Sequence, residues 1–369
     1  MKFTISDIET RVQQFANQTP SIDKLLKFCT EEKCSDLYIK VNDYPYIFRY
    51  GKMIKVPCYP ISDEIWNKWA GIAISSERNA GYVRQKMLDF QYTLPLHSFQ
   101  SPEDIDKNGR NNEEYRYRVS AGFSEGNKIA TFRMITPELP SFKNINYPQE
   151  VIDVLKQSME QKSGIVMLVG ETGSGKTTTL AASIHDFSQK GEPLDNSMII
   201  TLEDPIEYQY PSTSSTRIVQ KELGIDFMSF PLGVKQSLRE HPTHILCGEI
   251  RDEEGISTCV EAARTGHKVM TTFHTGSVSG TISRLYNYLS GDSDNIMFDL
   301  IANIDLIVCQ RLTADGSEFK LDTQYMFFTD EIKRKLQKVI FEGKNIPMEV
   351  DKLFSDPKLI EDKICKDWS

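Results

Sequence analysis

The residues of this chain with the clearest chemical meaning form a glycine-rich run at positions 170–177. The run reads Gly-Glu-Thr-Gly-Ser-Gly-Lys-Thr and fits the phosphate-binding pattern G-x-x-x-x-G-K-[ST]. Glycines allow backbone N–H groups to close around phosphate oxygens, and the N-terminus of a following helix adds partial positive charge. The sequence therefore predicts that a nucleoside triphosphate binds here.

Two residues of this run have defined roles at such a nucleotide. We expect Lys176 to reach the β- and γ-phosphates and the Thr177 hydroxyl to ligate Mg²⁺. A chance glycine-rich turn is disfavoured, because a strand-like apolar run at 165–169 precedes the pattern and a helix-like run follows it. The predicted cofactors are ATP and Mg²⁺, and the predicted nucleotide contacts are Gly170, Glu171, Thr172, Gly173, Ser174, Gly175, Lys176, Thr177 and Thr178.

Two acidic clusters follow predicted strands further along the chain. The first, at 201–208, includes Glu203, and hydrolysis requires a carboxylate that orients or deprotonates the attacking water. Taken alone, this cluster is also compatible with a solvated acidic turn. In the second cluster Gly248 stands where many proteins with this loop have Asp, so Glu249 is the first acid available to Mg²⁺, through water.

Histidines and arginines complete the set of candidate site residues. His267 and His274 bracket one predicted strand, and their spacing leaves a phosphate-sensing role and a structural role equally open. Upstream, strand alternation places Arg116 and Arg118 on one face, with Arg133 on a neighbouring strand. These arginines either act on the nucleotide as arginine fingers or line a solvated strand face.

Composition excludes several classes of protein. The 369 residues carry a formal net charge of −9, which argues against nucleic acid as the main partner. The seven cysteines form no C-x-x-C pair, so we expect buried thiols rather than a zinc site. No apolar run approaches membrane-spanning length, and we expect a soluble, cytosolic protein that docks on membrane complexes through protein contacts.

The pattern of elements changes at a proline-containing segment, and this predicts two domains. The first part mixes strands and a helix, whereas strands and helices alternate after residue 148, which predicts a mainly parallel sheet with helices on both faces. A charged, helical tail is expected at 329–369. The expected strands are 36–41, 46–50, 115–120, 129–135, 165–169, 197–202, 244–248, 268–273 and 305–310, and the expected helices are 22–30, 149–159, 176–188, 231–240, 253–264 and 277–289.

Four segments together resemble the signature boxes of the type II/type IV secretion ATPase superfamily, the hexameric motors of pili, secretion and conjugation. They are GETGSGKTTT at 170–179 (Walker A), TLEDPIEY at 201–208 (Asp box), LREHPTHILCGEIRD at 238–252 (Walker B) and TGHKVMTTFHT at 265–275 (His box). The resemblance implies an α/β fold: a RecA-like P-loop NTPase domain at 149–369, a smaller α+β PAS-like domain at 1–136, and a linker or hinge at 137–148.

Within the superfamily the chain is similar to the PilT-like branch, which includes pilus retraction ATPases and DotB/TraJ-type ATPases of type IVB secretion and conjugation. The resemblance implies that Glu203 handles the water and that Glu249 lies near Mg²⁺, and it leaves open which of the two is the general base. It also implies that His267 and His274 sense the γ-phosphate. The arginine strand, YRYRV at 115–119, implies contacts to nucleotide phosphates.

We therefore expect a homo-hexamer that hydrolyses ATP to ADP and phosphate, to power a type IV pilus or a type IVB secretion or conjugation machine. Its expected partners are inner-membrane platform or secretion-complex proteins, with peripheral membrane association at the inner face of the bacterial inner membrane and no direct nucleic acid contact. The alternatives are a RecA-type DNA motor, a small-molecule kinase, and a nucleotide-dependent scaffold with little turnover. The acidic balance argues against the DNA motor, and the lack of a marked acceptor pocket argues against the kinase. The candidate carboxylates Glu203 and Glu249 argue against the scaffold.

Overall fold

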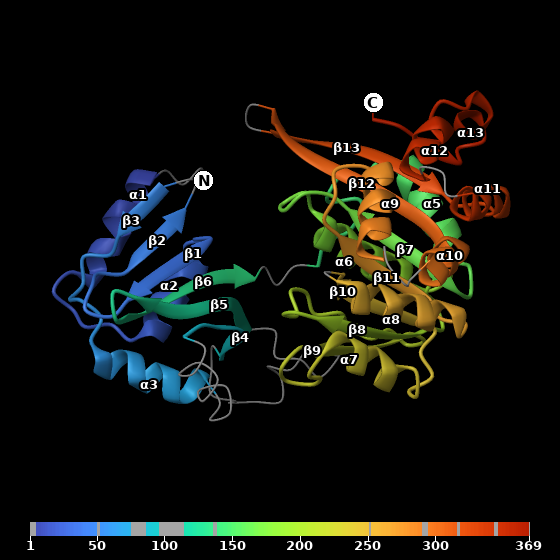
Figure 1. Cartoon of the computed structure of the whole chain (residues 1–369). Helices are drawn as coiled ribbons and strands as arrows, with labels where there is room; N and C mark the ends of the chain where they lie inside the picture. Colours follow the sequence, from blue (N-terminus) through green and yellow to red (C-terminus); the bar gives the residue numbers. More distant parts are fainter. Residues whose placement is uncertain are drawn as a thin grey trace. The chain divides into compact units, whose positions relative to one another are not determined.

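The computed structural model consists of two compact units, residues 1–137 and 138–369, and each has its own sheet and core (Figure 1). Pro137 and Glu138 of the predicted linker lie outside the described residues. So does most of the segment 98–114, whose polar and charged sequence predicts a loop. The described residues are 5–49, 52–74, 86–95, 114–135, 139–250, 252–289, 294–315, 318–342 and 346–368.

The first unit is a six-stranded antiparallel sheet with helices packed against it (Figure 1). The spatial order of its strands is β3-β2-β1-β6-β5-β4. Helix α2 shows why the sequence folds in this way, since the Ser21 side chain accepts a hydrogen bond from the Lys24 N–H and the helix buries Leu25 and Leu26. The elements are α1 (Ile5–Arg11), a 3-10 turn (Val12–Phe15), α2 (Ile22–Glu31), β1 (Asp36–Lys40), β2 (Tyr46–Arg49), β3 (Lys52–Lys55), α3 (Asp63–Ala73), β4 (Leu88–Pro95), β5 (Glu114–Ser124) and β6 (Asn127–Ile135).

The second unit is built on an eight-stranded sheet in the order β14-β13-β12-β7-β11-β10-β8-β9. The six strands from β12 to β9 are parallel, which confirms the predicted mainly parallel α/β sheet. Its elements are α5 (Gln149–Met159), β7 (Gly164–Val169), α6 (Lys176–Phe187), β8 (Met198–Glu203), β9 (Arg217–Glu222), α7 (Phe230–Ser237), β10 (His244–Glu249), α8 (Glu253–Arg264), β11 (Lys268–Phe273), α9 (Val278–Tyr288), α10 (Asp294–Asn303), β12 (Ile304–Asp315), β13 (Glu318–Phe327), α11 (Asp330–Phe341), α12 (Ile346–Leu353), α13 (Pro357–Glu361) and β14 (Cys365–Lys366).

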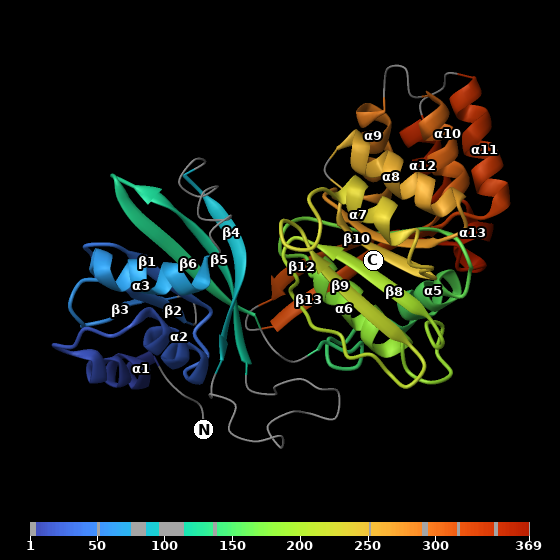
Figure 2. The same ribbon diagram turned by 90° about the horizontal axis from the view of Figure 1, so that it is seen from below.

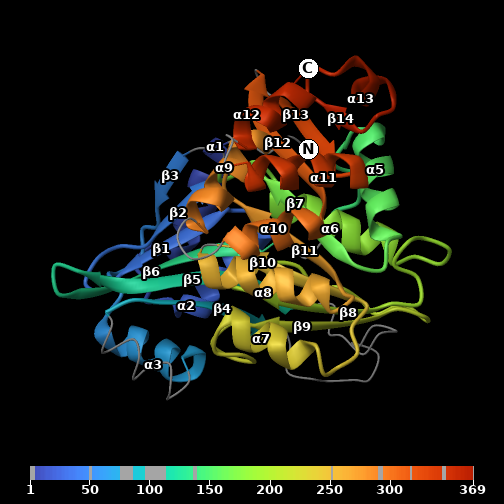
Figure 3. The same cartoon turned by 45° about the vertical axis from the view of Figure 1, so that its right-hand side comes forward.

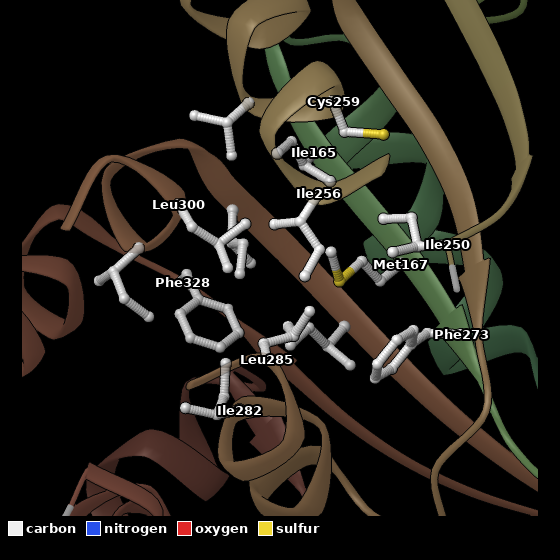
Figure 4. Packing of buried hydrophobic residues seen from close by; sticks show 14 of the residues in the cluster. Ile165, Met167, Ile250, Ile256, Cys259, Phe273, Ile282, Leu285, Leu300 and Phe328 are labelled. Carbon is white, nitrogen blue, oxygen red and sulfur yellow. The ribbon is translucent and has the colours of Figure 1, made fainter. Parts of the chain in front are cut away.

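Two apolar clusters cover the two faces of this sheet. Helices α5 and α6 pack on one face, against residues such as Val166 and Leu168. Helices α7 to α12 pack on the other, where Ile165, Met167 and Phe273 from the strands meet helical side chains (Figure 4). Because strand residues alternate between faces, β7 is buried on both sides and is apolar throughout.

The sequence did not reveal the edge strands of this sheet. β9 lies at one edge beside β8 (Figure 2), and four of the six residues in its sequence RIVQKE are polar, since the strand is only partly buried. The prediction of a helical tail is wrong at Cys365–Lys366, which form β14 and pair with Met326 and Tyr325 of β13. This pairing covers the edge that β13 would otherwise leave open. Figure 3 shows the helices α11, α12 and α13 near the C-terminus.

The segment that precedes α5 is attached to the second unit. The rings of Phe142 and Phe187 lie 5.4 Å apart, and the Phe142 N–H donates to Asp186 Oδ2 at 2.8 Å. His185 Nδ1 lies 3.1 Å from the carbonyl oxygen of Pro140. Residues 139–148, the described part of the predicted linker, are therefore fixed on α6.

A buried ion cluster lies at the edge of the sheet where β7, β11 and β12 begin. The fully buried Lys268 ammonium lies 2.5 Å from Asp305, and Lys333 of α11 lies 3.0 Å from the other oxygen of that carboxylate. Gly164 makes room for the carboxylate, since a Cβ there would lie 1.7 Å from Asp305 Oδ2. Burial lowers the pKa of Lys268, and Asp305 opposes that shift. Among the described helices, none is long and apolar enough to cross a membrane.

Removal of the shared carboxylate should destabilise the second unit strongly. Asp305→Ala leaves the Lys268 charge buried without its counter-ion, and we expect a loss of about 3–5 kcal/mol in the free energy of unfolding. The matched control is Asp299→Ala, which breaks an ion pair to Arg264 whose side chain is 60% exposed. That change should cost at most about 1 kcal/mol. Equal losses for the two variants in urea unfolding would contradict the prediction.

Candidate functional site

The parallel strands bring the predicted site residues to one edge of the second sheet. Strands β7, β11 and β10 are neighbours, and in that parallel register Phe273 lies beside Val169. The residues that follow these strands, among them Gly170, Glu249 and His274, therefore come together at the carboxyl edge, where ligands bind in such sheets.

The phosphate-binding loop joins β7 to α6. Gly170, Gly173 and Gly175 have φ angles of 154°, 81° and 86°, values that side chains rarely tolerate. Lys176 is almost fully buried, and its ammonium donates to the carbonyl oxygens of Gly170 and Glu171 at 2.8 and 2.9 Å. Burial lowers the pKa of Lys176, and Glu249 raises it. The lysine is thus folded back over the start of the loop.

The remaining predicted contacts of the loop lie at its surface or at its helical end. Glu171, Thr172 and Thr177 are exposed, so the side chains expected to meet a nucleotide and Mg²⁺ are accessible. The hydroxyl of Thr178 lies 3.4 Å from the hydroxyl of Tyr208. This contact ties the first turn of α6 to the segment that follows β8.

Strand β12 supports the loop from the other side. The Gln310 amide donates to the carbonyl oxygen of Ser174 at 2.6 Å and accepts from the Tyr147 hydroxyl at 3.2 Å. A Cβ at Gly170 would lie 2.4 Å from the carbonyl oxygen of Gln310 and 2.5 Å from Ser174 Oγ. Glycine at position 170 is therefore required by packing against β12 as well as by its φ angle.

Glu249 and His274 contact each other beside Lys176. His274 Nε2 lies 3.0 Å from Glu249 Oε1, and both side chains are partly exposed. The backbone of His274 is held by Arg284, whose guanidinium donates to the His274 carbonyl oxygen at 2.6 Å and stacks on the Phe273 ring. The structure thus places two of the predicted side chains in direct contact at the loop.

The surroundings of Gly248, which stands where Asp is common, are tight. A Cβ at Gly248 would lie 3.1 Å from the Leu202 carbonyl oxygen and 3.5 Å from the Phe230 ring. The β10–β11 register shifts at this residue, so that Cys247 pairs with Thr271 and Glu249 with Thr272. The irregularity leaves Glu249 as the acid that β10 presents at this edge.

Glu203 ends β8 and is almost fully buried. Its Oε1 accepts hydrogen bonds from the Thr201 hydroxyl at 2.7 Å and from the Gln220 amide at 3.1 Å. Burial raises its pKa to about 7, although these hydrogen bonds lower it. Leu202 pairs with Cys247, so Glu203 lies on the strand next to the one that carries Glu249.

The structure does not bring His267 to this edge. It precedes β11, and its carbonyl oxygen accepts from the Gly164 N–H at the start of β7. A six-residue strand spans about 20 Å, so His267 is too far from the loop to contact a phosphate held by the same chain. Instead, His267 Nδ1 lies near the carbonyl oxygen of Ala262 and the hydroxyl of Thr265.

The three arginines belong to the first unit. Arg118 and Arg133 pair directly across β5 and β6, and Arg116 lies two residues along on the same face. Arg116 is buried, whereas Arg118 is exposed. The Arg133 guanidinium donates to Asp36 at 2.9 Å, and its side chain is 69% exposed. Tyr117 and Val119 point to the opposite, apolar face.

Sequence reasoning missed several residues that surround the loop. Gln310 ends the predicted strand 305–310 and Arg311 follows it, but no local pattern indicates that β12 lies beside the loop. Trp368 lines a cavity of about 60 Å³ together with Arg311 and the loop. No sequence signal could reveal Trp368, because its place depends on the pairing of β14 with β13.

Comparisons with known proteins agree with this fold and site. The family described as "Type II/IV secretion system protein" matches residues 93–339. The chain is 30% identical to a twitching motility protein of Neisseria gonorrhoeae over 304 residues, which cover 81% of this chain and 70% of the relative.

Two solved structures are similar over nearly the whole chain. The ATPase DotB of Legionella pneumophila has a TM-score of 0.77 at 27% identity and covers 92% of this chain and 91% of its own. The pilus retraction motor PilT with bound ADP has a TM-score of 0.73 at 26% identity, with coverages of 91% and 89%. These similarities confirm the expected RecA-like fold with its smaller N-terminal domain and the expected membership in the PilT-like branch.

The raised pKa of Glu203 predicts a specific pH dependence. The pKa is about 7 in the folded chain and 4.5 in the reference state, so the folded state binds the proton more tightly. Protonated Glu203 therefore adds roughly 3 kcal/mol to the free energy of unfolding, and this contribution is fully present below about pH 4.5. It is lost as the pH rises to about 7. Infrared difference spectra of wild type minus Glu203→Gln should show a protonated carboxyl band that disappears near pH 7. Loss of the band already near pH 4.5 would contradict the assignment.

Proposed function

The chain belongs to the type II/IV secretion system protein family, and we propose that it forms a homo-hexameric ring that powers a type IV pilus or a type IVB secretion or conjugation machine. It is a P-loop ATPase of the secretion and pilus class that binds nucleotide. The observation that carries the proposal is the convergence of Lys176, Glu249 and His274 at one edge of the sheet, around the phosphate-binding loop.

The chain has the side chains that ATP with Mg²⁺ requires. Under this proposal the loop N–H groups of 170–177 hold the phosphates, and Lys176 leaves its two carbonyl partners to reach the β- and γ-phosphates. The exposed Thr177 hydroxyl and the Glu249 carboxylate supply the oxygen donors that Mg²⁺ prefers. When bound, the ion neutralises charge that develops on the phosphates.

The two carboxylates receive different roles. Glu203 has a pKa near 7 because it is buried, and a general base works best when its pKa lies near the working pH. We therefore assign Glu203 as the group that takes the proton of the attacking water. Glu249 contacts His274 and is partly exposed, which suits an acid that meets Mg²⁺ and the γ-phosphate side of the site.

Arg116, Arg118 and Arg133 are the proposed moving part of the site. They share one face of the first sheet. Under this proposal they contact the phosphates only in the closed state, so that bound ATP favours closure and hydrolysis releases the closed state. The hinge proposed within 137–148 has little freedom in its described part, because Phe142 and Tyr147 are packed on the second unit. His267 receives no role at the nucleotide of its own chain.

The ring is proposed to act through protein partners. Relatives carry the names type IV pilus ATPase PilU and type IV pilus retraction ATPase PilT. By analogy we propose contacts with inner-membrane platform or secretion-complex proteins at the inner face of the bacterial inner membrane, with only peripheral association. The net charge of −9 supports a protein partner rather than direct nucleic acid contact.

The enzymatic part is tested by variants of two side chains. Lys176→Ala removes the phosphate-binding cation, and we expect ATP turnover to fall at least about 100-fold in steady-state phosphate release. Glu249→Gln keeps the volume of the side chain but removes its charge, so ATP should still bind while turnover is lost. Thr313→Ala, an exposed change on β12, is the control and should turn over ATP like the wild type. Unchanged turnover in Lys176→Ala would refute the proposed site.

The ring is tested by its mass. Light scattering of micromolar protein with Mg²⁺ and a non-hydrolysable ATP analogue should give six times the chain mass of 42.2 kDa. Lys176→Ala should assemble less readily under the same conditions, because the nucleotide is then held weakly. A wild-type protein that stays monomeric with the analogue would exclude the ring and leave the ATPase assignment intact.

A further inference from the structure

Gln220, a partly buried residue of β9 that lies outside the four signature boxes, makes three hydrogen bonds at the carboxyl edge of the sheet. Its amide nitrogen donates to Glu203 Oε1 at 3.1 Å and to the carbonyl oxygen of Tyr208 at 2.7 Å. Its amide oxygen accepts from the Tyr210 N–H at 2.8 Å. One amide group therefore joins the Glu203 carboxyl to the segment that follows β8.

The two backbone partners determine which end of this amide meets Glu203. A backbone N–H only donates and a carbonyl oxygen only accepts, so the Gln220 oxygen points to Tyr210 and the nitrogen points to Tyr208. The second N–H of the same nitrogen is then directed at Glu203. Gln220 is thus a fixed donor to the carboxyl in both protonation states of Glu203.

These hydrogen bonds distinguish the two oxygens of the Glu203 carboxyl. Oε1 accepts from Gln220 and also from the Thr201 hydroxyl at 2.7 Å, and each carboxylate oxygen offers about two acceptor sites. Strand register produces this arrangement, since Gln220 lies opposite Thr201 in the parallel pairing of β8 and β9. Because Oε1 is fully engaged, a proton taken up by the carboxyl goes to Oε2.

The segment held by Gln220 reaches the first turn of α6. The Tyr208 hydroxyl lies 3.4 Å from the hydroxyl of Thr178, which comes directly after the phosphate-binding loop. Tyr210 is buried among the residues that cover this face of the sheet. The position of Glu203 is thereby tied, through Gln220 and Tyr208, to the helix that begins at the loop.

The titratable neighbours of Glu203 are acidic groups and a phenol. Burial is the main cause of the raised pKa of Glu203, and the charge of Glu207 raises that pKa further, whereas the Glu207 N–H lowers it. Glu222 of β9 lies opposite Glu203 in the register, and Tyr210 is close enough for Glu203 to raise the pKa of its hydroxyl, which burial already raises. Ionisation of Glu203 among these groups therefore depends on hydrogen-bond donors.

The cation that β9 carries beside Gln220 points away from Glu203. Lys221 lies between Gln220 and Glu222, so strand alternation directs it to the other face, where its ammonium contacts Glu240 at 2.6 Å. The neighbouring positions on β10 and α6 are Gly248 and Thr178, which carry no charge. At this position β9 supplies Glu203 with an amide donor rather than an ammonium group.

We propose that Gln220 is a positioning residue for ATP hydrolysis, because its fixed amide holds Oε1 of Glu203 and leaves Oε2 as the oxygen that takes the proton of the attacking water. The inference rests on the proposed role of Glu203 as the base. In this step a water proton passes to Oε2 while the water oxygen uses an electron pair to bond the γ-phosphorus. The bond from the γ-phosphorus to the bridging oxygen breaks, ADP leaves with that electron pair, and Oε2 afterwards returns its proton to phosphate or solvent.

The test follows Glu203 and ATP turnover against pH in Gln220→Met, which keeps the length of the side chain without its amide. Loss of the donor disfavours the ionised carboxylate. The infrared band of protonated Glu203, taken as the difference from the matching Glu203→Gln protein, should therefore disappear about one pH unit higher than in the wild type. The rise of steady-state turnover with pH should move upward equally. Turnover on the high-pH plateau should fall about tenfold with little change in KM for ATP, because the base is no longer oriented.

The matched control is Gln324→Met in β13. Gln324 is 5% exposed, and its amide accepts from the Val278 N–H at 2.8 Å and donates to Asp367 at 2.7 Å. The change also removes a buried amide, but its partners lie on α9 and near the end of the chain. Gln324→Met should leave the midpoints of the carboxyl band and of turnover as in the wild type. Urea unfolding of both variants separates a loss of stability from an effect on Glu203.

A second variant keeps the inference testable if Gln220→Met does not fold. Gln220→Glu retains an acceptor for the Tyr210 N–H and places a like charge beside Glu203, so the midpoint of turnover should rise further than in Gln220→Met. Wild-type midpoints and plateau in these variants would show that Gln220 only supports the fold, and a shifted carboxyl band with unchanged turnover would equally overturn the inference. Wild-type turnover in Glu203→Gln would instead refute the base role within the proposed function.

Discussion

The nucleotide edge of this protein depends on the close approach of two backbones at Gly170. No side chain fits there, because a Cβ would collide with the Gln310 carbonyl oxygen and with the Ser174 hydroxyl. The contact joins the loop to β12, a strand that comes more than a hundred residues later. Through it, the position of the loop is coupled to Gln310, Arg311 and the last residues of the chain.

Charged groups are distributed unequally between the two edges of the sheet. At the amino edge, Lys268 and Asp305 are buried and fully engaged with each other, an arrangement that holds α11 on the sheet through Lys333. At the carboxyl edge, the pKa of Glu203 is raised and the pKa of Lys176 is lowered, because burial disfavours the charged form of each group. The first edge serves stability, and the second has groups whose protonation and contacts can change with a ligand.

The family resemblance explains the chemistry, and the structure explains where this chain departs from it. A Cβ at Gly248 would make a tight contact of 3.1 Å with the Leu202 carbonyl oxygen. The next residue, Glu249, is partly exposed and contacts His274. His274, whose backbone is held by Arg284, contacts that carboxylate, whereas His267 belongs to the opposite edge.

The sequence alone determined the loop, the class of fold and most strands of the parallel sheet, because those features depend on local pattern. The motif at 170–177 and the apolar run before it carry their meaning within a dozen residues. Only the tertiary structure decided which distant residues meet. Burial gave Glu203 its raised pKa, and the pairing of β14 brought Trp368 to the loop. These outcomes depend on long-range register and solvent exclusion, which local pattern does not encode.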